Sequence, residues 1–228
     1  DPIRWAQGLP GVTTGADGTT AFYVRGGNMG NNLITLDGVP VYGYSHLLGL
    51  TTIIPQDVMS EATLLKGGFD GGSSNFTAGH LAITTRDPDM EKFRMSAAMN
   101  NFLASVSLET PINEKMSFMF SGRISPLAWE YKAVRGLLPD LLGGFDDFGA
   151  GVGDLYGKFR WQTGKRSFLN VSFLGSMDGY SFGTVAEDES GIRHTNSEKM
   201  GWNNMIGTVS WHLDGARSFM DFRASVNR

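Results

Sequence analysis

The sequence predicts a mainly β protein, with a small α+β domain over residues 1–88 and antiparallel strands of a transmembrane β-barrel over residues 89–228. Three observations support this prediction. The first 88 residues are rich in Gly, Thr and Asn and contain only short apolar runs. The later residues alternate between apolar and polar types with a period of two, which is the spacing of a strand with two different faces. The connections between these later strands alternate between short and long, as in outer-membrane barrels.

Residues 1–88 contain short predicted elements separated by turn-forming residues. Residues 1–7 can form one helix, which the sequence GLPG at residues 8–11 would end. Four β-rich segments bounded by Gly, Asn, Asp or Pro predict short strands. They are residues 21–25, 33–37, 62–66 and 81–85. Residues 55–59 begin with Pro and predict a single helical turn.

Residues 89–228 predict about seven strands, each with one apolar face and one face of small, polar or charged residues. The predicted strands are residues 93–99, 102–108, 116–124, 155–162, 169–174, 204–213 and 220–226. Aromatic residues at strand ends or on the apolar face suit the interfacial girdle of a membrane barrel. They are Trp161, Phe173, Tyr180, Trp202 and Trp211.

The predicted connections differ in length at the two ends of these strands. Residues 113–114, 163–165 and 214–215 are tight-turn sequences, whereas residues 125–152 and 177–201 are long connections. Short turns at one end and long loops at the other are typical of an outer-membrane barrel. A soluble sheet with one buried face would show a similar alternation and stays open as an alternative.

The number of strands has a consequence for the size of the barrel. Seven strands leave two open edges, which cannot face lipid. An eight-stranded barrel is just wide enough to be filled by its own side chains, so it could not also contain residues 1–88. We therefore expect this chain to be a fragment of a larger barrel that encloses the small domain.

The composition argues against several classes of function. The net charge of −4 and the pI near 5.5 argue against the basic surface that nucleic-acid binding needs. The absence of Cys excludes a disulfide scaffold and any thiolate metal site. No stretch approaches the roughly 18 apolar residues of a membrane helix, so a membrane could be crossed only by the strands of a closed barrel. No nucleic-acid partner and no cofactor are expected.

Three segments of the small domain carry the most information. They are LPGV at residues 9–12, FYVRGG at 22–27 with the following NLITLDGVPVY at 32–42 and SHLLG at 45–49, and SEATLLKGGF at 60–69. In this order and spacing they resemble the plug domain of TonB-dependent outer-membrane receptors. The resemblance is to the Bacteroidetes type, in which a carboxypeptidase-regulatory-like domain precedes the plug. Residues 71–80 (GGSSNFTAGH) differ from the Gly-Gly-Arg-Leu-Ser stretch that this family usually has there.

The resemblance implies a plug followed by the first third of a large barrel of about 22 strands, in the outer membrane of a Gram-negative cell. It implies energy-coupled uptake of a substrate, with no catalytic residues, and a TonB-contacting segment upstream of this chain. The implied partners are outer-membrane lipid, TonB, and a surface lipoprotein or other subunits of an outer-membrane complex. The alternative is a non-transporting structural or accessory barrel subunit of such a complex.

The plug motifs suggest residues that make contacts within the plug or between plug and barrel. These are Arg25, Gly26, Gly27, Asp37, Gly38, Glu61 and Lys66. An Arg at the end of a buried strand favours a carboxylate partner. Asp37 and Glu61 are the candidate partners of Arg25, and a solvent-exposed Arg25 is the alternative. The pair Asp37-Gly38 is first of all a turn signal.

Two loops of the small domain are candidates for contact with a substrate. Residues 41–50 contain Tyr42, Tyr44 and His46, and aromatic and polar groups at a plug apex could form a concave site. Asn28 and Asn31 belong to a second candidate loop. The alternative is that these residues only seal the plug against the barrel.

Other kinds of site are weakly indicated. The His residues are scattered, without a metal-ligand spacing, so no metal site is expected. Asp146 with Asp147, and Glu187 with Asp188 and Glu189, could bind Ca²⁺, but solvated loops are the preferred reading. RGGNMG at residues 25–30 has the spacing of a phosphate loop, yet a strand follows it and not a helix, so a turn is preferred. Ser45-His46 lacks the context of a hydrolase nucleophile.

Overall fold

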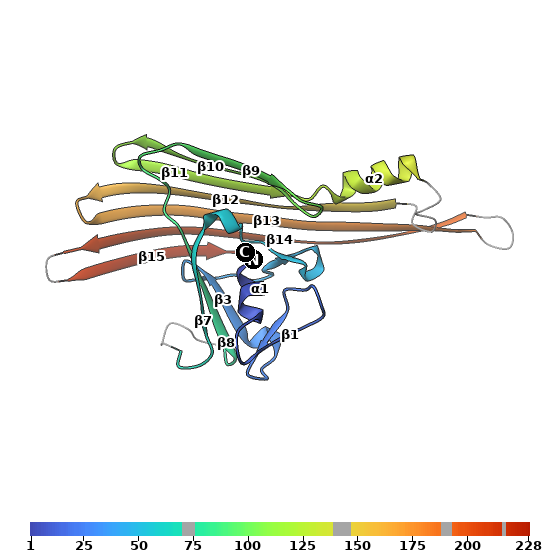
Figure 1. Ribbon diagram of the computed structural model, residues 1–228, viewed down its shortest axis with the longest axis horizontal. Helices are drawn as coiled ribbons and strands as arrows, with labels where there is room; N and C mark the ends of the chain where they lie inside the picture. The colour runs from blue at the N-terminus through green and yellow to red at the C-terminus, as the bar shows by residue number, and fades with distance from the viewer. Residues whose placement is uncertain (70–75, 139–146, 188–192, 216–217) are drawn as a thin grey trace.

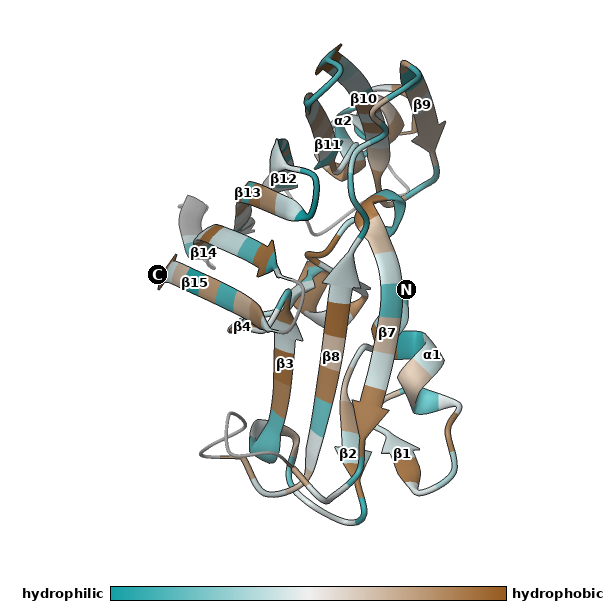
Figure 2. Ribbon diagram, turned by 90° about the vertical axis from the view of Figure 1, so that its left-hand side faces the viewer, coloured by the Kyte–Doolittle hydropathy of each residue, from teal (hydrophilic) through white to brown (hydrophobic). Residues whose placement is uncertain are grey.

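The protein is described by a computed structural model, which covers residues 1–69, 76–138, 147–187, 193–215 and 218–228. It consists of a small domain that ends with a strand at Thr85 and of a curved sheet with seven antiparallel strands. We call this seven-stranded sheet the wall. The small domain lies against one face of the wall, and its longer strands cross the direction of the wall strands (Figures 1 and 2). The chain is mainly β, as the sequence predicts.

The small domain begins with helix α1 (Pro2–Gln7), in agreement with the helix predicted for residues 1–7. The Asp1 carboxylate accepts hydrogen bonds from the backbone N–H groups of Ile3 and Arg4. These bonds satisfy donors of the first turn that have no partner within the helix. Pro2 stands in that turn, where a missing N–H costs nothing.

A four-stranded sheet forms the centre of the small domain, in the order β4 (Val39–Pro40), β3 (Asn32–Leu36), β8 (Gly79–Thr85) and β7 (Met59–Leu65). Strands β3 and β8 are parallel. Together with β2 (Phe22–Val24) and the turn η3 (Gln56–Val58), they confirm the four predicted strands and the helical turn.

The other short elements of the small domain were not predicted. These are β1 (Val12–Thr14), β5 (Ser45–His46), β6 (Thr51–Thr52), η1 (Met29–Asn31) and η2 (Leu47–Gly49), and also β4. Each is only two or three residues long, so its conformation is set by its pairing partner and not by a local pattern.

The core of the small domain continues into the wall. Buried side chains of α1, β2, β3, β8 and the segment before η3 form one cluster, which includes Ile3, Phe22, Val24, Ile34, Ile53, Ile54, Leu81 and Ile83. Four wall residues, Met119, Tyr156, Leu174 and Ile206, belong to the same cluster. Burial of apolar surface therefore holds the small domain on the wall as well as folding it.

The wall strands pair in chain order, each with its sequence neighbours. They are β9 (Arg94–Met99), β10 (Ala104–Asn113), β11 (Met116–Ile124), β12 (Asp147–Gly164), β13 (Ser167–Glu187), β14 (Arg193–Asp214) and β15 (Phe219–Asn227). The seven predicted strands and the short turns between β10 and β11, β12 and β13, and β14 and β15 are confirmed.

The two predicted long connections are shorter than expected. Helix α2 (Leu127–Leu137) occupies part of residues 125–152, and β12 has begun by Asp147. Most of residues 177–201 belongs to β13 and β14, because Met177 to Glu187 pair continuously with Asn203 to Arg193. Gly, Ser and Asp in this stretch favour strands poorly, but the ladder of backbone hydrogen bonds outweighs that local preference.

The two faces of the wall differ in polarity. Trp161, Phe173 and Trp211 lie on the face that points away from the small domain, and Trp211 is 43% exposed. Tyr180 and Trp202 were predicted for the same aromatic girdle, but they pack beside Leu47 of the small domain. Their even positions in β13 and β14 place them on the inner face, with Leu174 and Ile206. Among the described helices, none is long and apolar enough to span a membrane.

Candidate functional site

The inner face of the wall carries successive rows of residues, because β12, β13 and β14 pair without a break over their central parts. The row Asp154, Ser176 and Asn204 is polar. The next row towards the short turns, Tyr156, Leu174 and Ile206, is apolar. The row after it, Lys158, Ser172 and Thr208, is polar again. The small domain contacts each row in a different way.

A buried charged cluster joins the small domain to the first polar row. His46 is fully buried, with Nδ1 2.6 Å from Asp178 Oδ2 and Nε2 3.0 Å from Asp154 Oδ2. Arg123 of β11 donates to both carboxylate oxygens of Asp154 and, through Nη2, to the carbonyl oxygen of Thr52 at 2.7 Å. We call His46, Arg123, Asp154 and Asp178 the clasp.

The geometry of the clasp fixes the protonation state of His46. Both ring nitrogens face carboxylate oxygens, which only accept hydrogen bonds, so both nitrogens must carry a proton. The imidazolium and the Arg123 guanidinium then balance the charges of Asp154 and Asp178. Burial alone lowers the pKa of His46, but the hydrogen bonds and charges of the two carboxylates outweigh burial and raise that pKa.

The clasp also fixes a strained backbone. Leu47 and Leu48 both have positive φ, at 53° and 57°, which costs an L-residue about 1–2 kcal/mol each. The N–H of Leu47 donates to Asp178 Oδ1 at 3.3 Å, and the Tyr180 hydroxyl donates to the same oxygen at 2.9 Å. Asp178 therefore holds the η2 turn in a conformation that the chain would not adopt by itself.

Further bonds attach residues 39–52 to the wall. Asn204 Nδ2 donates to the carbonyl oxygen of Gly43 at 3.1 Å. The Asn227 side chain of β15 donates to the carbonyl oxygen of Pro40. Below these contacts, the apolar row of Tyr156, Leu174 and Ile206 packs into the core of the small domain. We call this apolar row the collar.

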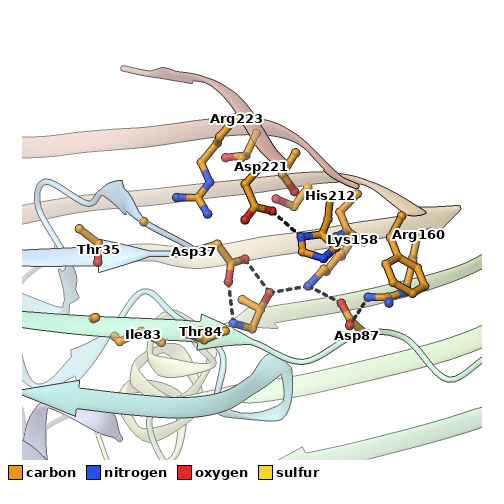
Figure 3. Close-up of a pocket in the computed structure, with 18 of the residues that line it drawn as sticks. Thr35, Asp37, Ile83, Thr84, Asp87, Lys158, Arg160, His212, Asp221 and Arg223 are labelled. Carbon is orange, nitrogen blue, oxygen red and sulfur yellow. Dashed lines mark hydrogen bonds and ion pairs between the residues drawn. The ribbon is translucent and has the colours of Figure 1, made fainter. Parts of the chain in front are cut away.

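A second anchor lies on the other side of the collar, around Thr85 at the end of β8. Its hydroxyl donates to Asp37 Oδ2 at 2.6 Å and accepts hydrogen bonds from the Tyr156 hydroxyl at 3.1 Å and from Lys158 Nζ at 3.0 Å. Lys158 also pairs with Asp87 at 3.0 Å, and Arg160 pairs with the same carboxylate (Figure 3). The segment that joins the small domain to the wall is therefore fixed at its start.

The linker after β8 is held by a further buried carboxylate. Glu109 of β10, only 2% exposed, pairs with Arg86. The same carboxylate accepts the N–H of Asp89 at 3.1 Å, and Ser117 Oγ donates to the carbonyl oxygen of Pro88 at 3.2 Å. The charges of Lys158 and Arg160 outweigh burial and hold the pKa of Asp87 below its usual range.

A cavity of about 670 Å³ lies between the small domain and the wall, on the short-turn side of the collar, and both charged side chains and apolar ones such as Ile83, Phe168 and Phe222 line it. The small domain contributes Thr35, Asp37, His80 and Thr84 from one face of its sheet, whose other face forms the core. The wall contributes Lys158, Arg160, Asn170, Ser172, Thr208, Ser210, His212, Asp221 and Arg223. Charged side chains from both parts point into this space (Figure 3). Asn170 Oδ1 is buried there and has no hydrogen-bond partner among the described residues.

The structure separates the residues predicted to contact a substrate. Tyr42 is 60% exposed, on the same loop as the clasp, and Asn28 and Asn31 are exposed beside η1. Tyr44 is partly buried against the core, and burial raises the pKa of its hydroxyl. His46 is buried between two wall carboxylates, which favours the alternative that it seals the small domain against the wall.

The three sequence motifs of the small domain meet in space. The N–H of Arg25 donates to the carbonyl oxygen of Gly11, and Lys66 Nζ donates to that of Pro10 at 2.7 Å. Gly26 has φ +74°, which suits only Gly. A Cβ at Gly27 would lie 2.4 Å from that of Ala78, so a larger residue would not fit there.

The expected carboxylate partners of Arg25 are bonded elsewhere. Asp37 accepts from the backbone N–H and the hydroxyl of Thr85, and Glu61 is exposed and accepts from Thr63. Within the described residues neither carboxylate pairs with Arg25, which is itself exposed. Asp37 has φ +49° and Gly38 φ +77°, as the turn signal predicts.

The wall residues in these contacts were not among the residues predicted to form a site. Asp154, Asp178 and Arg123 had no assigned role. The alternation of each strand nevertheless places them opposite its apolar face. No group of three or more His, Asp or Glu in the described residues could hold a metal ion. The acidic side chains of residues 146–147 and 187–189, considered for Ca²⁺, lie outside the described part of the structure.

Comparison with known proteins agrees with this architecture. Residues 4–78 match the family model of the TonB-dependent receptor plug domain. No curated protein sequence matches the chain.

Three solved receptors of Pseudomonas aeruginosa have a similar fold. The ferric enterobactin receptor PfeA shares 16% identity at a TM-score of 0.59, over 100% of this chain and 38% of PfeA. FpvA with a bound pyoverdine shares 14% at 0.59, over 94% of this chain and 30% of FpvA. The siderophore receptor PirA shares 17% at 0.52, over 100% of this chain and 46% of PirA. The chain thus spans less than half the length of each, and its fold is that of a plug with the first strands of a barrel.

Proposed function

We propose that this chain is part of a TonB-dependent transporter of the Gram-negative outer membrane. Residues 1–88 would act as the plug and residues 89–228 as the first strands of a barrel of about 22 strands. The barrel would contact outer-membrane lipid through the apolar face of the wall. TonB would act on a segment upstream of residue 1 and rearrange the plug, so that a substrate passes without any bond being made or broken.

One observation carries this proposal. The segment that matches the plug family is the domain that lies on the inner, polar face of the wall, while the opposite face exposes Phe173, Val209 and Trp211. A sheet that is apolar outside and polar inside, with a domain on its inner side, suits a plugged membrane barrel. A soluble sheet would have its apolar face covered.

The residues of the plug would divide into two roles. Tyr42, Asn28 and Asn31 are exposed and would contact the substrate from the plug, whereas His46 and Asp37 attach the plug to the wall or to its own strands. Siderophores, cobalamin, glycans and peptides all remain candidate substrates. The siderophore receptors that share the fold favour testing ferric siderophores first.

The proposal can be tested with the full-length protein in its outer-membrane fraction. We expect an intact mass several times 24.8 kDa, with peptides beyond both ends of this chain. Cells with and without the gene, each with and without TonB, would then be compared for depletion of ferric siderophores, cobalamin, oligosaccharides and oligopeptides from defined medium. Depletion of one solute only when both genes are present would support transport.

A different outcome would support the alternative. If the protein is folded in the outer membrane but no solute shows TonB-dependent depletion, it would be a non-transporting subunit. Copurification with a surface lipoprotein or other outer-membrane subunits would then identify its complex. The Bacteroidetes type would be supported by a carboxypeptidase-regulatory-like domain in the upstream peptides.

A further inference from the structure

The cavity between the small domain and the wall is lined by one row of wall residues with an arginine at each end. Arg160 of β12 lies opposite Asn170 of β13, Asn170 opposite Ser210 of β14, and Ser210 opposite Arg223 of β15. All four residues line the cavity. Because neighbouring strands are about 4.8 Å apart, the amide and the hydroxyl stand between two guanidinium-bearing residues. We call these four residues the arginine row.

Arg223 is the cation of this row that has no carboxylate partner. Arg160 is paired with Asp87, and His212 Nδ1 lies 2.6 Å from Asp221 Oδ1. Among the described residues, the Arg223 side chain has neither an ion pair nor a hydrogen-bond acceptor, and no dashed line reaches it in Figure 3. A guanidinium group binds carboxylates and phosphates through two parallel hydrogen bonds. Arg223 is therefore available to an anionic ligand.

The small domain holds Arg223 at the cavity. A Cβ at Gly38 would overlap Arg223 Nη1, so the guanidinium lies directly against the backbone of the turn between β3 and β4. Gly38 leaves room for this approach because it has no side chain, and its φ of +77° also suits Gly. The wall cation thus meets the small domain where both line the cavity, and a ligand there can contact both parts.

Asn170 gives an independent indication of a ligand. Its Oδ1 is buried and has no hydrogen-bond partner among the described residues. Buried polar atoms of proteins are nearly always hydrogen-bonded, so this oxygen needs a donor from water or from a ligand. The hydroxyl groups of Ser172, Thr208 and Ser210 line the same cavity and can each donate or accept. A ligand that carries hydroxyl groups matches this surface, because it can donate to Asn170 and exchange hydrogen bonds with these residues.

The rest of the lining limits the charge and the size of the ligand. Phe168 and Phe222 offer apolar surface to a carbon skeleton. Three carboxylates also line the cavity, those of Asp37, Asp87 and Asp221. They would repel a ligand with several negative charges, so a single carboxylate suits the site. The cavity of about 670 Å³ is within the usual range of ligand sites, about 300–1,000 Å³.

We propose that the cavity is a binding site for a small organic acid with one carboxylate and several hydroxyl groups, and that this ligand bridges the small domain and the wall. The carboxylate pairs with Arg223, and the hydroxyl groups donate to Asn170 Oδ1 and bond to Thr84 of the small domain. None of the residues predicted to contact a substrate lines this cavity. The inference goes beyond the proposed function, because such binding requires neither TonB nor transport.

The test measures binding to the purified full-length protein by isothermal titration calorimetry, with three probes of similar size. Gluconate carries a carboxylate and hydroxyl groups, glucose lacks the carboxylate, and hexanoate lacks the hydroxyl groups. Gluconate should bind about tenfold or more tightly than either, because each of the others leaves a charged or buried group of the site without its hydrogen bond. Absence of gluconate binding, or equal affinity for gluconate and either comparison probe, would overturn the inference.

Variants of the arginine row locate the site. Arg223→Gln should weaken gluconate binding about 10- to 100-fold and leave glucose binding unchanged. The matched control is Arg166→Gln, in the turn between β12 and β13, because Arg166 is 67% exposed and does not line the cavity. This control should bind gluconate as the wild type does. Asn170→Leu removes the buried acceptor, so it should weaken gluconate binding while hexanoate binding stays the same.

Two further measurements test the bridge and the folding of the variants. Thr84→Val changes only the side of the small domain and should also weaken gluconate binding. Gluconate should raise the unfolding midpoint of the wild type in denaturant, because it binds the folded protein, but not that of Arg223→Gln. Arg223→Lys keeps the charge without the planar fork, so it should retain part of the affinity and serves if Arg223→Gln does not fold.

The inference is overturned if Arg223→Gln binds gluconate like the wild type, or if Arg166→Gln loses binding equally. Unchanged binding by Thr84→Val would refute the bridge between the two parts. A failure of the proposed function looks different, because it is the absence of TonB-dependent depletion of any solute. That result would leave the three probe affinities and their dependence on Arg223 as they are.

Discussion

Removal of the Asp178 carboxylate is the most direct test of how the clasp holds the plug. Asp178→Ala takes one carboxylate from a fully buried cluster and leaves the His46 imidazolium with one carboxylate partner. Breaking a buried ion pair by removing one partner costs about 3–5 kcal/mol. At 1.36 kcal/mol for each factor of ten, local opening of residues 39–52 should become roughly 10²- to 10⁴-fold more frequent.

Hydrogen exchange of the full-length protein, followed by mass spectrometry, measures this opening directly. The amide of Leu47 donates to Asp178, so peptides that contain residues 44–50 should lose protection most. Peptides from β3 and β8 should change little. Asp214→Asn, at an exposed pair with Arg166, is the matched control and should leave all peptides unchanged. Equal loss of protection over the whole plug, or none in residues 39–52, would refute the reasoning.

Four further predictions follow from other contacts. Thr85→Val should destabilise the plug–wall contact by about 1–3 kcal/mol, because Asp37, Tyr156 and Lys158 lose a buried hydrogen-bond partner. Thr85→Ser keeps the hydroxyl group and should keep the stability. Denaturant unfolding of both variants measures the difference. Gly79→Ala should cost about 1–3 kcal/mol in the same assay, since its Cβ would lie 2.6 Å from Val24 Cγ2. Gly30→Ala, whose Cβ would have no atom of the described residues within 4 Å, should be neutral. Because the pKa of Asp87 is lowered, its contribution to stability is present above its ordinary pKa near 3.9 and is lost as the pH falls through the lowered value. Asp87→Asn should therefore cost at most about 1 kcal/mol at pH 7, since the pair is partly exposed, and progressively less as the pH falls below that ordinary pKa. Because the pKa of His46 is raised, the clasp is fully formed below pH about 6.5 and weakens as the pH rises through the raised value. Proteolysis at residues 39–52 should therefore accelerate at alkaline pH in the wild type. The same rise in pH should not accelerate proteolysis in His46→Ala.

The elements that follow a local period could be predicted from the sequence, and those that depend on pairing could not. The alternation in β14, with Met205, Val209 and Trp211 on one face, marked a strand with the correct orientation. The outer half of the same strand, from Arg193 to Met200, has no such alternation, and it is a strand because β13 pairs with it. A period of two is a property of one segment, whereas a ladder needs its partner.

The clasp was beyond prediction for the same reason. His46 was recognised as a notable residue of its loop, but its partners are 108 and 132 positions away along the chain. No spacing rule connects residues that meet only when a domain docks on a sheet. One signal was present: Asp154 and Asp178 stand at inward positions, where a charge needs a partner if the face is covered. Applied to every inward charge of the wall, that rule would have marked Arg123, Lys158 and Arg160 as well.

The placement of charge on the wall explains why the contact between the small domain and the wall is most sensitive to substitution at a few residues. A purely apolar contact, such as the collar alone, would resist separation in proportion to its buried area and would have no preferred point of opening. A buried charged cluster contributes little net stability when complete but is costly when one member is missing. The clasp therefore depends on each of its members, because loss of either Asp154 or Asp178 leaves the charge of the buried His46 only partly balanced. The Thr85 anchor is attached to a sheet with its own ladder, so substitutions in the clasp should leave that contact with the wall in place.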